Sequence, residues 1–83
     1  MKVRLTHSWI LSTEHPKSSH GVPVLVHDGT RDAYDPGDSV TCYESWGPMT
    51  AVHAVHRLAR AADLTPEQRH FVDLFTRSHG GAS

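Results

Sequence analysis

The spacing of apolar residues changes from a period of two to a helical period near residue 46. Before that point, short β-branched runs alternate with polar residues; after it, apolar residues recur at intervals of three and four. A chain with strands first and helices afterwards is typical of an α+β fold. We therefore predict a small antiparallel sheet of about three strands in the N-terminal half, covered by a C-terminal αα-hairpin.

Three segments carry the strand pattern, at residues 2–11, 22–27 and 39–44. In the first segment, the apolar residues Val3, Leu5, Trp9 and Leu11 share one face, which predicts a half-buried strand. Residues 12–21 have no apolar periodicity and are predicted to form an exposed, mobile loop.

The segment between the second and third strands admits two interpretations. Asp28-Gly29 is a hairpin-turn signal, after which residues 33–34 could return as a further antiparallel strand. Alternatively, residues 28–38 form one irregular loop and the sheet has three strands. The sequence Asp-Pro-Gly-Asp at 35–38 has the order expected of a type II turn.

Two helices are predicted, at about 48–62 and 66–79. Pro48 stands where a proline can occupy the first helical position. Thr65 and Gln68 have the spacing of a capping box, with Pro66 between them. The link between the helices is so short that they must fold back on each other.

A chain of 83 residues fits one domain, 1–83, and leaves little room for a deep pocket beside its core. It lacks a nucleophile elbow, a glycine-rich phosphate loop and a dinucleotide fingerprint, so we expect no enzyme and no cofactor. Cys42 is the single cysteine and excludes an internal disulfide. With no apolar run of signal-peptide or membrane-spanning length, we expect a cytoplasmic protein without membrane contact.

Acidic residues are concentrated between residues 27 and 46, a segment that contains five acidic residues and one arginine. We interpret this segment as an acidic interaction surface that steers toward a basic partner. Its candidate residues are Asp28, Asp32, Asp35 and Asp38, with Tyr34 and Trp46 as aromatic anchors. The alternative is that each aspartate serves its own turn and that Trp46 closes the end of the core.

The polar face of the first predicted helix carries a second candidate surface. His53, His56, Arg57 and Arg60 fall within a sector of roughly 100°. Such a cationic strip could dock on phosphates or on an acidic protein surface; the alternative is an ordinary solvated helix face. The spacing of His53 and His56 also allows a metal site completed by Cys42 or His70, but the chain lacks the usual zinc-ligand pairs.

The net charge of −1 does not resemble that of a nucleic-acid-binding domain. We therefore expect a small non-catalytic regulator or inhibitor that docks on a larger protein. Small phage or mobile-element inhibitors, such as anti-CRISPR proteins, are one class of orphan domains of this kind. A nucleic-acid-contacting accessory protein and a metal-binding domain are the alternatives. An exposed strand edge would also permit a homodimer.

Overall fold

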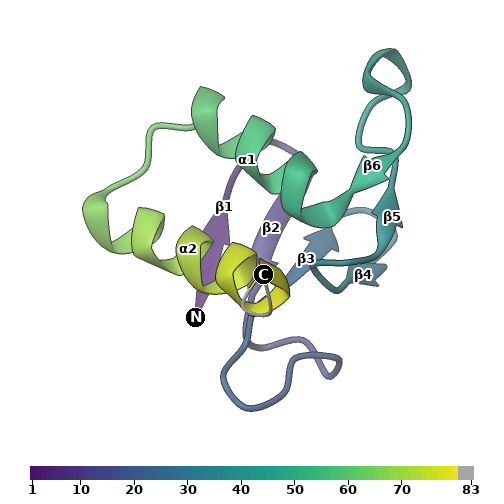
Figure 1. Ribbon diagram of the computed structural model, residues 1–83. Coiled ribbons are helices and arrows are strands. Elements are labelled where there is room, and N and C mark those ends of the chain that lie inside the picture. Colours follow the sequence, from purple (N-terminus) through teal and green to yellow (C-terminus); the bar gives the residue numbers. More distant parts are fainter. Residues whose placement is uncertain (81–83) are drawn as a thin grey trace.

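The computed structural model describes residues 1–80 and places the strands before the helices (Figure 1). The elements are β1 (Lys2–Arg4), β2 (Trp9–Ser12), β3 (Val24–His27), β4 (Ala33–Tyr34), β5 (Ser39–Val40), the 3₁₀ helix η1 (Glu44–Trp46), β6 (Met49–Thr50), α1 (Ala51–Ala61) and α2 (Pro66–Gly80). Strands β1 to β4 form one antiparallel sheet in sequence order, and β5 pairs with β6. The α+β class and the C-terminal pair of helices are confirmed.

The prediction of one strand over residues 2–11 is wrong, because this segment is the β1–β2 hairpin. The amides of Leu5 and Thr6 both donate to the carbonyl of Trp9, at 2.9 and 3.2 Å, and close the turn. Both arms direct their apolar residues to the same face of the sheet, so the alternation continues through the turn. Without a glycine or a proline at the turn, the sequence gives no sign of it.

The other strands are shorter than predicted. Strand β3 begins at Val24, two residues late, because Pro23 has no amide hydrogen to donate to a ladder. Strand β5 ends at Val40 rather than residue 44, and η1 follows it. Residues 13–23 connect β2 to β3 with only an isolated bridge between Ser19 and Val22. The predicted mobility of this loop stays a prediction.

The return strand after Asp28-Gly29 exists as β4, so the alternative of one irregular loop over 28–38 is wrong. Arg31, with φ 68°, occupies the left-handed position in this β3–β4 hairpin. The turn at 35–38 is closed by the amide of Asp38, which donates to the carbonyl of Asp35 at 3.0 Å. Among the described glycines, only Gly21 and Gly47 have positive φ, so Gly37 does not form the predicted type II turn.

Helix α1 begins later than predicted, and α2 begins where predicted. Met49 and Thr50 pair with β5, so the helix starts after Thr50, whose hydroxyl accepts from the amide of His53 at 3.4 Å. The capping box of α2 is complete. The Thr65 hydroxyl accepts from the Gln68 amide at 3.2 Å, and the Gln68 side chain accepts from the Thr65 amide at 2.9 Å.

The core lies between one face of the four-stranded sheet and the two helices, which cover the same side of it (Figure 1). On this inner face, Val3, Leu11 and Leu25 are neighbours in register. They pack in the core with apolar residues of α1 and α2, among them Leu58 and Phe75. Burying each such side chain contributes about 1.5–3 kcal/mol to folding.

The outer face of the sheet carries a different row of side chains. Arg4, Ile10 and Val26 are neighbours in register there, and neither α1 nor α2 covers them. The start of the loop 13–23 and the β3–β4 hairpin contribute residues to this face, among them His15 and Arg31.

Replacing Thr65 with alanine should lower the free energy of unfolding by about 1 kcal/mol, because it removes the oxygen that accepts from the first turn of α2. Urea unfolding followed by circular dichroism measures the change. Thr41→Ala, at an exposed position after β5, is the matched control. Equal losses in the two variants would contradict a specific capping role.

Candidate functional site

The connection between β5 and β6, residues 41–48, projects from the body of the molecule (Figure 1). It contains η1, in which the Trp46 amide donates to the Tyr43 carbonyl at 3.0 Å. Gly47 follows with φ 71°, a left-handed conformation that favours glycine. This tight turn sets the Tyr43 and Trp46 rings edge to face, with centroids 4.9 Å apart.

Helix α1 contributes a third side chain to this group. The Arg57 guanidinium lies over the Trp46 ring, 4.2 Å from its centroid, in a cation–π contact. Tyr43 is 40% exposed, and its hydroxyl lies 3.4 Å from the Thr6 hydroxyl. We name this group the Tyr43–Trp46–Arg57 cluster. Trp46 is half-buried and packed against the core, as the second of the two interpretations expects; its role as an aromatic anchor stays a prediction.

The four basic residues expected on one helix face, His53, His56, Arg57 and Arg60, are all exposed on α1. Helix α1 contains no acidic residue, and none of the four forms an ion pair within residues 1–80. A groove of about 320 Å³ between α1 and α2 is lined by His56, Arg60 and Arg69, with Asp73 as its one acidic residue. The cationic strip therefore extends from α1 onto α2.

The carboxylates of the predicted acidic surface have partners within the chain. Asp28 pairs with Arg4 at 3.6 Å, and Asp32 accepts from the Thr30 hydroxyl at 3.1 Å. Two of the acidic residues share Lys17, whose ammonium lies 3.9 Å from Asp35 and 3.4 Å from Asp38. Less negative charge is thus free for a partner than the sequence suggests.

Two further residues of this segment are fixed by local contacts. The Asp35 amide donates to the Asp38 carboxylate at 2.8 Å and, together with Lys17, holds the pKa of Asp38 below its ordinary value, against a smaller opposing effect of desolvation. Tyr34 is half-buried, and its ring lies 6.1 Å from that of Trp9 in the core. The Tyr34 ring therefore lies beside the core and is not a freely exposed aromatic side chain.

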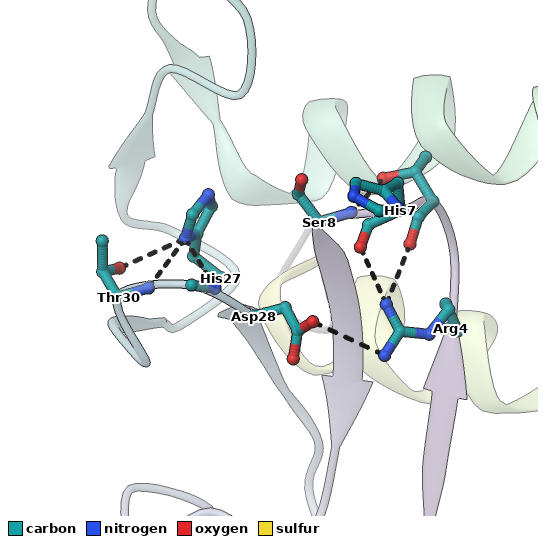
Figure 2. A network of polar contacts seen from close by, with 8 residues as sticks. Arg4, His7, Ser8, His27, Asp28 and Thr30 are labelled. Carbon is teal, nitrogen blue, oxygen red and sulfur yellow. Dashed lines mark hydrogen bonds and ion pairs between the residues drawn. The ribbon is translucent and has the colours of Figure 1, made fainter.

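A polar network that the sequence did not reveal ties the two hairpins together (Figure 2). The Arg4 guanidinium donates to the His7 carbonyl at 2.8 Å and pairs with Asp28, so it joins the β1–β2 turn to the end of β3. His27 Nδ1 accepts from the amides of Gly29 and Thr30, at 3.2 and 3.1 Å. The only hint in the sequence is a histidine directly before the Asp-Gly turn.

Cys42 is half-buried, and burial raises the pKa of its thiol to about 11. At neutral pH the thiol is protonated and therefore a poor nucleophile and metal ligand. Among the described side chains, those of residues 1–77, no three His, Cys, Asp or Glu lie where they could hold a metal ion. Within residues 1–80, neither helix combines the length and the hydropathy needed to cross a bilayer.

Comparison with protein-family models, curated proteins and solved structures finds no match for this chain.

Cys42 should react slowly with thiol reagents. A pKa raised from 9.0 to about 11 leaves about a hundredfold fewer thiolates near neutral pH than in an unperturbed cysteine. The rate of iodoacetamide alkylation at pH 7.5, compared with that of the urea-unfolded chain, measures this difference. Equal rates in the folded and unfolded chains would show that Cys42 is not protected.

Proposed function

We propose that this protein is a small non-catalytic regulator or inhibitor that docks on a larger protein through the Tyr43–Trp46–Arg57 cluster. The observation that carries the proposal is the contact of Tyr43 and Trp46, on the projecting loop, with Arg57 of α1. Tyrosine, tryptophan and arginine are the residue types that contribute most of the binding energy at protein interfaces.

The arrangement of the cluster also favours binding. Trp46 is held between Tyr43 and Arg57, so its ordering costs little additional entropy when a partner covers it. His53 and Arg60 extend from the same helix and would guide an acidic partner surface toward the cluster. The acidic residues between 27 and 46 are the weaker candidate, because most already have partners. The single thiol, Cys42, is consistent with the cytoplasmic location that we propose.

Removing Tyr43 and Arg57 together should abolish capture of the partner. The wild-type chain, a Tyr43→Ala/Arg57→Ala variant and an Arg77→Ala control are immobilised, and the proteins that they retain from a lysate of the native host are quantified by mass spectrometry. We expect one protein to be retained by the wild type and the control, and about tenfold or more less by the double variant.

Circular dichroism and urea unfolding establish that the double variant remains folded. Asp32→Lys/Asp35→Lys tests the acidic segment in the same assay. Undiminished retention of the partner by the folded Tyr43→Ala/Arg57→Ala variant would refute the role of the cluster. If retention is lost only in the Asp32→Lys/Asp35→Lys variant, the acidic segment is the binding surface instead.

A nucleic-acid-contacting accessory protein is the second candidate. The observation in its favour is the groove lined by the basic residues His56, Arg60 and Arg69. Asp73 is the one acidic residue in its lining. Arg57 contributes less to this surface than the sequence suggests, because its guanidinium already stacks on Trp46. Few phosphates would therefore be neutralised, and binding would be weak.

Any binding to DNA or RNA should weaken steeply as salt is added. Fluorescence anisotropy with a short labelled duplex and a short RNA, at low and at physiological salt, measures it. Arg60→Glu/Arg69→Glu should lose binding, and Tyr43→Ala should retain it. Absence of a complex at low salt would eliminate this candidate.

A further inference from the structure

The outer face of the sheet carries a concave pocket of about 310 Å³, a volume at the lower end of small-molecule sites. Its lining includes two apolar neighbours across β2 and β3, Ile10, which is half-buried, and Val26, which is 7% exposed. One wall is the start of the loop 13–23, with Glu14 and His15, and the other is the β3–β4 hairpin, with Arg31. The pocket is separate from the Tyr43–Trp46–Arg57 cluster, because none of its lining residues belongs to that cluster.

Hydrogen bonds hold the two walls in place before any ligand binds. His15 Nδ1 accepts from the Lys17 amide at 3.0 Å, so in the neutral ring the proton is on Nε2. Nε2 then donates to the Arg31 carbonyl at 3.2 Å and links the loop to the hairpin. The Arg4–Asp28 pair, which also lines the pocket, links β1 to the end of β3 (Figure 2). A pre-formed pocket loses little entropy on binding.

The charges around the pocket are unequal. Three cationic side chains, Lys2, Arg4 and Arg31, face the carboxylates of Glu14 and Asp28. Asp28 is paired with Arg4, and Glu14 lies 3.9 Å from Lys2 and 3.2 Å from the N-terminal ammonium. Among residues 1–80, no carboxylate lies within ion-pairing distance of the Arg31 guanidinium. Arg31 is therefore the cation available to an anionic group.

The side chain of Arg31 is not needed for the hairpin itself. Its contacts to the rest of the chain come from the backbone: its amide donates to the His27 carbonyl at 2.8 Å, and its carbonyl accepts from His15. The residue also has φ 68°, a conformation that glycine adopts at less cost. An arginine at a position that favours glycine indicates that its guanidinium has a role beyond folding.

We propose that this outer-face pocket binds a small amphipathic carboxylate, with its apolar part on Ile10 and Val26 and its carboxylate on Arg31. A guanidinium suits a carboxylate because it can donate two parallel hydrogen bonds. Because Lys2 and Arg4 offset Glu14 and Asp28, the lining has an excess of one positive charge, that of Arg31, which matches the single negative charge of a carboxylate.

Titration of the ¹³C,¹⁵N-labelled full chain with hexanoate, followed by NMR, tests the proposal. We expect saturable shifts at the methyl groups of Ile10 and Val26 and at the Arg31 amide. Acetate, which lacks the tail, and hexylamine, which reverses the charge, should both bind at least about tenfold more weakly. Hexanoate shifts that do not saturate, or hexylamine binding as tight as that of hexanoate, would overturn the proposal.

Arg31→Gly is the decisive variant, because glycine accepts the left-handed backbone while the guanidinium is removed. We expect about tenfold weaker hexanoate binding together with an unfolding midpoint in urea equal to or higher than that of the wild type. Arg77→Ala, which removes an exposed arginine outside the pocket, should bind as the wild type does. If Arg31→Gly is unfolded, Arg31→Asn replaces it, since asparagine also tolerates this conformation. Wild-type affinity in a folded Arg31 variant would refute the assignment.

Discussion

The burial of one face of the four-stranded sheet under α1 and α2 is the contact on which the other features depend. Leu11, Leu25 and Phe75 are completely buried in this layer. A chain of 83 residues has enough apolar side chains for one such layer and no second. The opposite face of the sheet is not covered by the helices, although Ser12, Val24 and Val26 on it are buried, and the surfaces proposed for binding lie on this face and on the β5–β6 connection.

The parts of the fold that depend on neighbouring residues could be predicted from the sequence, and those that depend on distant pairing could not. The predicted start of α2 agrees with the structure, because the capping box joins two residues only three positions apart, Thr65 and Gln68. The start of α1 was placed too early because Met49 and Thr50 pair with β5, about ten residues earlier in the chain. The β1–β2 turn was missed because its residues continue the alternation of the strands.

The same distinction applies to the candidate sites. The sequence identified Trp46 and Arg57 separately, but their contact depends on the turn at Gly47 and on the position of α1. It identified the aspartates of residues 27–46, but Lys17 reaches Asp38 across 21 positions of the chain. No sequence pattern reveals such pairs. The outer-face pocket was missed altogether, because its walls come from two loops that meet only in the folded chain.

The lengths of the two edge strands determine how this protein can associate. Strand β1 has three residues and β4 has two, so each edge offers only a few unpaired backbone donors and acceptors. A strand from another molecule would gain too few hydrogen bonds there for β-augmentation to hold it. These short edges therefore offer little template for extending the sheet, and the partner recognition that we propose would depend on side chains, whose identity determines specificity.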